Sequence, residues 1–240
     1  MDTPSTEHDL AQALSTVAQQ LAAEPDEQTT LAGIVGAAVS TVPGVVHGGI
    51  SRVTGRQVTA QVPTAELVRV CDQAQTELDE GPCLEAIRHQ RTVLVDDMAH
   101  EDRWPRFAAR AVELGVGSMI SFQLFVEDDD LGALNLYGAT GARFGDEERI
   151  IGELFASHAA VALAGAARDR QLNEALATRD TIGQAKGLLM AREKITGNQA
   201  FTTLVRASQQ TNIKLAEIAT WLATEHEQPG QGQTHRPRSL

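Results

Sequence analysis

The sequence predicts an α+β domain built on an antiparallel sheet flanked by helices, then a long, coiled-coil helix that leads into a small all-α domain of three helices. Short segments rich in Val, Ile and Leu come in pairs around turn residues, which is typical of antiparallel hairpins. From about residue 146 onward, apolar residues recur at steps of three and four, as in an amphipathic helix. We therefore expect a helix at 1–25, a sheet domain at 26–165, a helical domain at 166–226 and a disordered tail at 227–240.

Two amphipathic helices open the chain. The first covers residues 9–23 and stops before Pro25, because the residue before a proline disfavours the helical conformation. The second begins after Asp26, whose carboxylate can cap its free amide groups, and ends before Pro43 and Gly44.

The sheet domain continues with short strands and helices separated by turn residues. We expect strands at 45–53 and 57–62, helices at about 64–75 and 83–89, a strand at 92–95, a helix at 103–114, and strands at 118–126 and 131–137. The last two strands flank the acidic turn 127–130 and form a hairpin at the centre of the sheet.

A long helix follows, and Asp146, Glu147 and Glu148 suit its positive amino-terminal end. Its three- and four-residue steps form a degraded heptad seam that predicts a homodimer through residues 146–182. The seam residues are Ile151, Leu154, His158, Val161, Gly165, Arg168, Leu172, Ala175, Arg179 and Ile182. The small residues between 159 and 167 would equally allow this helix to pack on the sheet of its own domain.

The charge of the chain is unevenly distributed. The net charge of −12 argues against a polyanionic partner for the chain as a whole. Residues 1–167 hold 10 Lys and Arg against 25 Asp and Glu, whereas residues 168–240 hold 10 against 7. The carboxyl-terminal part can therefore face phosphate groups, although a solvated helix surface of mixed charge would give the same counts.

Composition argues against several other classes of protein. No apolar run approaches the roughly 18 residues of a membrane span, and the polar amino terminus lacks a secretory signal, so we expect a cytoplasmic protein. Cys71 and Cys83 are too few for a disulfide scaffold or a zinc site, and the histidines are isolated, so no metal is expected. No catalytic motif is present, we expect no enzyme activity, and the sequence specifies no cofactor.

The segment from residue 179 onward carries the motif "IGQAKGLLM" and then "NQAFTTLVRASQQTNIKLAEIATWL". This pattern resembles the ANTAR domain, a three-helix RNA-binding antiterminator module. Upstream, "LDEGPCLEAIRHQRTVLVDD", "RWPRFAARAVELGVGSMISFQL" and "LGALNLYG" resemble the GAF domains that precede ANTAR in actinobacterial regulators. The resemblance implies a sensor joined to a module that binds hairpin loops in leader transcripts and controls transcription termination.

The ANTAR-like segment offers cations for phosphates, and amides and a hydroxyl for base edges in a loop. The candidate RNA-binding residues are Arg179, Lys186, Arg192, Lys194, Arg206, Ser208, Gln209, Asn212 and Lys214. Phe201 is expected in the small core, and so is Trp221. Two alternatives remain: a helix-turn-helix with residues 214–224 in a DNA groove, and a sensor whose helical tail docks a protein.

GAF domains commonly hold a small molecule between the sheet and its crossing helices. Alternation along the central strands puts Ile120, Phe122 and Leu124 on one face and a mixed set on the other. The ligand-binding candidates are Trp104, Ser121, Gln123, Asn135 and Tyr137, although a partly solvated sheet face is an equal interpretation. Some GAF domains reduce methionine sulfoxide with several cysteines, but two cysteines and an attached regulatory module argue against that activity here.

Overall fold

The computed structural model describes residue 15 and residues 26–54, 57–89, 91–124 and 131–227. The predicted helix at 9–23 and the predicted tail lie almost entirely outside these residues. The chain divides into two compact units, residues 1–167 and residues 168–240. Each unit is described separately below.

The first unit is built on a five-stranded sheet in the order β2-β1-β5-β4-β3, in which every neighbouring pair is antiparallel. The strands are β1 (Val45–Thr54), β2 (Gln57–Ala60), β3 (Val93–Val95), β4 (Val116–Leu124) and β5 (Leu131–Ala139). The predicted α+β class and the central β4–β5 hairpin are therefore confirmed.

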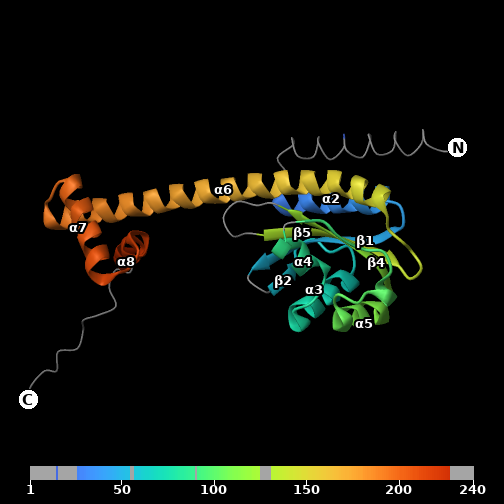
Figure 1. The fold of residues 1–240 in the computed structure, drawn as a ribbon. Helices are drawn as coiled ribbons and strands as arrows, with labels where there is room; N and C mark the ends of the chain where they lie inside the picture. The colour runs from blue at the N-terminus through green and yellow to red at the C-terminus, as the bar shows by residue number, and fades with distance from the viewer. Residues whose placement is uncertain (1–14, 16–25, 55–56, 90, 125–130, 228–240) are drawn as a thin grey trace, which may run out of the picture. The chain divides into compact units, whose positions relative to one another are not determined.

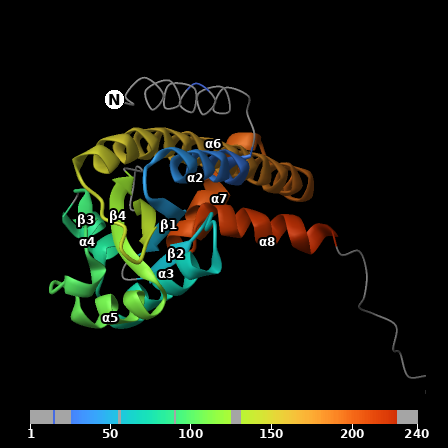
Figure 2. The same cartoon turned by 90° about the vertical axis from the view of Figure 1, so that its right-hand side faces the viewer.

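One face of the sheet is covered by α2 (Glu27–Thr41) and by the first part of α6 (Asp146–Glu193), as Figures 1 and 2 show. The Asp26 carboxylate caps α2 by accepting from the amides of Gln28 and Thr29, as the sequence predicts. The buried side chains of this layer come from both helices and both central strands. They include Leu31, Ile34, Ile120, Phe122, Leu134, Leu136, Phe155 and Leu163.

The opposite face is covered by α3 (Glu66–Leu78), α4 (Pro82–His89), the short 3₁₀ helix η1 (Met98–His100) and α5 (Pro105–Glu113), visible below the sheet in Figure 1. Phe107, Met119 and Tyr137 are buried in this layer. The Glu80 carboxylate accepts hydrogen bonds from the amides of Arg106 and Phe107, which satisfies donors in the first turn of α5. The domain is thus a three-layer arrangement with one apolar core on each side of the sheet.

Helix α6 is where the predicted seam and the structure differ. Ile151, which the seam includes, is only 6% exposed and packs on the sheet together with Phe155, Ala159 and Leu163. These four residues recur every four positions, so this row faces the domain. Among the apolar residues left exposed, Leu154, Val161 and Leu172 belong to the predicted seam. The exposed ones are Ile150, Leu154, Val161, Leu172 and Leu176.

No apolar run of membrane-span length was expected from the sequence, but by length and composition alone α6 would suffice to cross a membrane. In this structure, four of its apolar residues, Ile151, Phe155, Ala159 and Leu163, are buried in the core of the sheet domain.

The second unit consists of the end of α6, α7 (Gly197–Thr211) and α8 (Leu215–Glu227). Its core is small: Ala185, Leu204 and Ala219 are buried, and Ile182, Leu189, Leu215, Ile218 and Leu222 pack around them. The prediction that Phe201 and Trp221 belong to this core is wrong, since their side chains are 42% and 59% exposed. Phe201 follows the buried Ala200, and one residue along a helix turns the side chain by about 100° to the edge of the buried face.

The ends of these helices are set by local chemistry. Lys194 adopts a left-handed conformation (φ 54°) after α6, and Thr196 forms a capping box with Gln199 at the start of α7. Gly197 therefore begins α7. Asn212 is left-handed after α7, a conformation that asparagine adopts more readily than most residues and that ends the helix.

Candidate ligand site and nucleic-acid interface

A polar cluster lies inside the sheet domain, on the face that α3, α4 and α5 cover. Ser121 on β4 is opposite Asn135 on β5, and its hydroxyl donates to the side-chain oxygen Oδ1 of Asn135 over 2.8 Å. The Asn135 amide nitrogen in turn donates to the hydroxyl oxygen of Ser51 on β1 over 3.0 Å. All three side chains are fully buried, so a chain of hydrogen bonds crosses three strands of the sheet.

Helix α3 contributes a carboxyl group to this cluster. The Ser51 hydroxyl donates to Oδ2 of Asp72, which is 1% exposed, while Oδ1 of Asp72 has no hydrogen-bond partner among the described residues. Burial raises the pKa of Asp72 to about 7, and the hydrogen bond from Ser51 opposes that shift. Near neutral pH, the interior of the domain therefore holds a carboxyl group that can be either neutral or charged.

Gln75 lies one turn further along α3 and reaches the start of α4. Its Oε1 accepts from the amide of Cys83 over 2.9 Å. Gly81 permits this approach because it has a positive φ of 133° and because a Cβ there would meet Gln75 Oε1 at 2.4 Å. The Gln75 amide nitrogen has no partner among the described residues.

Two thiols and a phenol complete the surroundings of Asp72. Burial, with the carboxyl group of Asp72 nearby, raises the pKa of Cys71 to about 12 and that of Cys83 further. The same two causes raise the pKa of Tyr137, whose hydroxyl has no partner among the described residues. These groups stay protonated at neutral pH, so Asp72 is the group of this cluster that titrates there.

The structure brings Ser121, Asn135 and Tyr137 together, and their complete burial excludes the alternative of a partly solvated sheet face. Gln123 follows on the same strand, with its amide nitrogen buried and unpartnered among the described residues. Sequence reasoning missed Ser51, Asp72 and Gln75. The alternation of β1 could have indicated Ser51, but no pattern in α3 distinguishes its inward polar residues from a solvated face.

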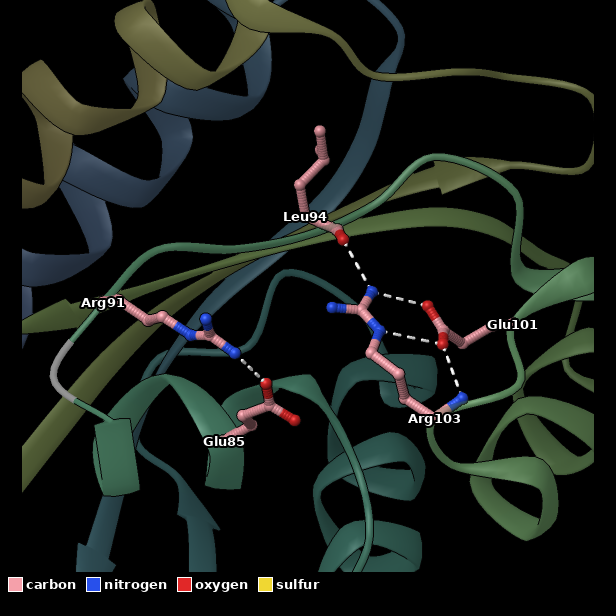
Figure 3. A network of polar contacts seen from close by, with 5 residues as sticks. All are labelled: Glu85, Arg91, Leu94, Glu101 and Arg103. Carbon is pink, nitrogen blue, oxygen red and sulfur yellow. Dashed lines mark hydrogen bonds and ion pairs between the residues drawn. The ribbon is translucent and has the colours of Figure 1, made fainter.

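Trp104 lies at the edge of this layer, where it precedes α5 and is 7% exposed. The Arg103 guanidinium covers its ring at 4.4 Å from the centroid. Arg103 is itself held by the Leu94 carbonyl and by Glu101, as Figure 3 shows, and the bonds to Glu101 raise its pKa. In the same view, Arg91 pairs with Glu85. The Trp104 side chain is therefore buried at the edge of the core and is covered by an arginine that is itself hydrogen-bonded in place.

In the second unit, a groove of about 870 Å³ runs along α6 beside α7. Arg179, Lys186 and Phe201 line it, and the Lys186 Nζ lies 5.9 Å from the centroid of the Phe201 ring. Among the described residues, neither Arg179 nor Lys186 has a carboxylate partner within 4.0 Å. The groove thus combines an exposed aromatic ring with two cations that have no ion-pair partner among the described residues, and the carboxylate of Asp180 also lines it.

The other candidate RNA-binding residues lie elsewhere in this unit. Arg192 and Lys194 are exposed at the end of α6, where Arg192 pairs with Glu193, and Arg206 is exposed on α7. The third group, at the turn between α7 and α8, comprises Ser208, Gln209, Asn212 and Lys214. The Ser208 hydroxyl donates to the Ile213 carbonyl over 2.6 Å, so this side chain stabilises the turn.

Comparison with protein families matches residues 24–164 to the GAF domain and residues 170–222 to the ANTAR domain. This chain belongs to the GAF domain family and carries a carboxyl-terminal ANTAR domain. Both domains are regulatory, and the antiparallel sheet described above is the core of the GAF fold. None of the curated proteins matches the GAF–ANTAR chain.

Solved structures support the GAF fold. A GAF sensor protein from Burkholderia vietnamiensis aligns with a TM-score of 0.52 at 18% identity, covering 68% of this chain and 98% of that one. The GAF domain of a phosphoenolpyruvate-protein phosphotransferase from Coxiella burnetii gives 0.53 at 15%, with the same coverage of 68% and 98%. Free methionine-R-sulfoxide reductase from Neisseria meningitidis gives 0.52 at 18%, covering 68% and 91%. At these identities the likeness concerns the fold alone.

The GAF domain's interior also bears on metal binding. Among the residues that the structure describes, no three His, Cys, Asp or Glu side chains are grouped as metal ligands would be. Asp72 and the two cysteines share the interior with neutral hydrogen-bonding groups.

Proposed function

We propose that the GAF–ANTAR chain is a signal-responsive regulator that binds hairpin RNA through its ANTAR domain and thereby controls transcription termination. The observation that carries this proposal is the ANTAR match over residues 170–222, in a unit that displays the uncompensated cations Arg179 and Lys186. Cations without carboxylate partners are free to neutralise phosphates, which supplies most of the affinity for a nucleic acid. The basic excess after residue 168 supports the same conclusion.

RNA is favoured over duplex DNA by the surface of α8. A recognition helix presents polar and basic side chains to the major groove while neighbouring side chains contact phosphates. The exposed side of α8 instead carries Glu217 and Trp221, and Lys214 is the single basic residue of the sequence from 211 to 227. We therefore do not assign α8 to a DNA groove.

The sensing part of the proposal rests on the interior of the GAF domain. We infer that a small molecule with hydrogen-bond donors binds there, against Asp72 and the predicted residues Ser121, Asn135 and Tyr137, with Gln123 and Trp104 at the border. A buried carboxyl oxygen without a donor is costly, and a ligand amine or amide would satisfy it. Binding would then change the packing between α3 and the sheet.

Transmission requires that the sensor affects the output domain, and we propose that this happens in a homodimer through residues 146–182. The exposed apolar residues Leu154, Val161 and Leu172 support this, because an unpartnered apolar row on a helix is typical of a coiled-coil contact. A dimer presents two ANTAR domains, so two RNA loops are bound with an avidity that depends on their spacing.

We place the sensor domain at 26–165, the linker and output domain at 166–226, and the protein in the cytoplasm.

A gel-shift comparison tests the proposed function. The full chain is titrated into stem-loop RNA, and into duplex DNA of the same stem sequence, at rising salt. We expect a complex with the stem-loop RNA that outlasts the DNA complex as salt rises, since loop contacts add to phosphate contacts. Equal affinity for both probes would contradict the proposed preference for RNA. Retention of neither probe would contradict the proposal as well, and would favour the protein-docking alternative.

A further inference from the structure

The exposed ring of Phe201 is the least expected feature of the ANTAR domain. Helix α7 buries Ala200 and Leu204, so the domain's core is complete without Phe201, which is 42% exposed. Exposed aromatic rings on a polar surface are the usual platforms for unpaired nucleobases, because every base has an apolar face that can stack. Phe201 lies in the groove that Arg179 and Lys186 also line.

The position of Lys186 relative to this ring is well defined. Its Nζ lies 5.9 Å from the ring centroid, and a Cβ placed on Gly197 would be 3.9 Å from the same Nζ. The ammonium group is therefore held between the ring and the first turn of α7. A phosphate that follows a stacked base would find a cation within reach at this point.

We propose that this groove binds one unpaired nucleobase of the RNA, stacked on Phe201, with the adjoining phosphate held by Lys186 and Arg179. The proposal rests on RNA being the partner of the ANTAR domain, and it adds the position at which the RNA is read. Gln184 and Asp180 also line the groove, and their amide and carboxylate groups can pair with the edge of a base. Because the Asp180 carboxylate repels phosphate, the sugar-phosphate backbone of the RNA would lie on the side of Lys186 and Arg179.

Trp221 is the competing platform, since it is more exposed than Phe201. It lies on α8 among acidic and neutral residues, and the described residues place no cation over its ring, whereas Lys186 stands beside Phe201. The nearest Lys or Arg in the sequence, Lys214, lies seven positions before Trp221, whereas Lys186 is beside the Phe201 ring itself. The geometry therefore favours Phe201.

Photocrosslinking locates the stacked base directly. The full chain is mixed with a pool of stem-loop RNAs with randomised loops, in which uridine is replaced by 4-thiouridine, then irradiated and digested with trypsin. Cleavage after Lys194 and Arg206 yields one peptide that contains Phe201, separate from the peptide that contains Trp221. We expect the crosslink on the Phe201 peptide. A crosslink confined to the Trp221 peptide would overturn the proposal.

Affinity measurements with the same pool give an independent answer. Phe201→Leu should weaken binding about tenfold, because one base–aromatic stack is lost, whereas Phe201→Tyr and Trp221→Leu should bind as the unaltered chain does. The far-ultraviolet circular dichroism of each variant checks that the helices persist. Equal affinity of Phe201→Leu and the unaltered chain would overturn the proposal even though RNA binding holds. Failure of the unaltered chain to bind RNA would instead refute the function on which the proposal rests.

Discussion

The carboxyl group of Asp72 makes the stability of the GAF domain depend on pH. Its pKa is about 7 in the folded chain, against 3.8 for an ordinary Asp, so between these values the folded state binds a proton that the unfolded state lacks. The contribution of Asp72 to the free energy of unfolding is therefore greatest below pH 3.8. It falls as the pH rises from 3.8 to 7, by about 1.4 kcal/mol per pH unit at most.

Asp72→Asn removes this titration and keeps the shape of the side chain. We expect the variant to be more stable than the unaltered chain at pH 8, with a smaller decline between pH 5 and pH 8. Urea unfolding at both pH values measures the difference. The exposed Asp102→Asn is the matched control and should retain the decline. An equal decline in Asp72→Asn would show that this carboxyl group is not responsible.

Residue-level prediction from sequence succeeded where a strand set the direction of the side chain. Alternation along β4 separated Ile120 and Phe122 from Ser121, and the structure places these two groups in opposite layers. It failed for Asp72, because burial of a polar helical residue depends on which element covers it. It failed for Phe201 because the small core is already filled by Ala185, Leu204 and Ala219.

At the scale of elements, the contact between α6 and the sheet depends on Gly152. A Cβ at this position would meet the Phe122 ring at 2.3 Å, so the helix could approach β4 this closely only with glycine. The sequence contains no sign of this constraint, since glycine within a helix otherwise only lowers helical propensity.

Gly152→Ala should destabilise the GAF domain by about 1–3 kcal/mol, because the clash with a buried ring exceeds the gain in helix propensity. Gly36→Ala is the matched control, because Gly36 is a helical glycine of α2 with no atom within 4 Å of the added Cβ. The free energy of unfolding of this variant should rise by up to about 1 kcal/mol. Thermal unfolding of both variants decides. A stabilised Gly152→Ala would mean that α6 packs less closely than the structure indicates.

Element boundaries were predicted best where a capping residue marks them. Asp26 caps α2, as expected from its residue type. The end of α6 was harder to predict, because a lysine adopts the left-handed conformation there and a threonine caps the next helix.

For the whole molecule, the proposed dimer depends on the outer face of α6. Val161 and Leu172 are 65% and 60% exposed, so Val161→Glu together with Leu172→Glu should convert a dimer into a monomer without disturbing either core. Light scattering coupled to gel filtration measures the mass. Asn173→Glu is the control, since it points about 100° away from Leu172 on the same helix. A chain that is monomeric before substitution, or dimeric after it, would refute this interface.

The family of the chain was predicted from its ANTAR and GAF motifs, whereas its signal was not, because the residues around Asp72 come together only in the folded domain. RNA binding as proposed above requires that Arg179 and Lys186 neutralise RNA phosphates. The most direct measurement is the salt dependence of stem-loop RNA binding by the full chain. The double variant Arg179→Gln, Lys186→Gln should show a weaker salt dependence: the negative slope of log affinity against log salt should become less steep by about 1.4. Arg69→Gln in the GAF domain should leave the slope unchanged. An unaltered slope in the double variant would show that Arg179 and Lys186 do not neutralise RNA phosphates.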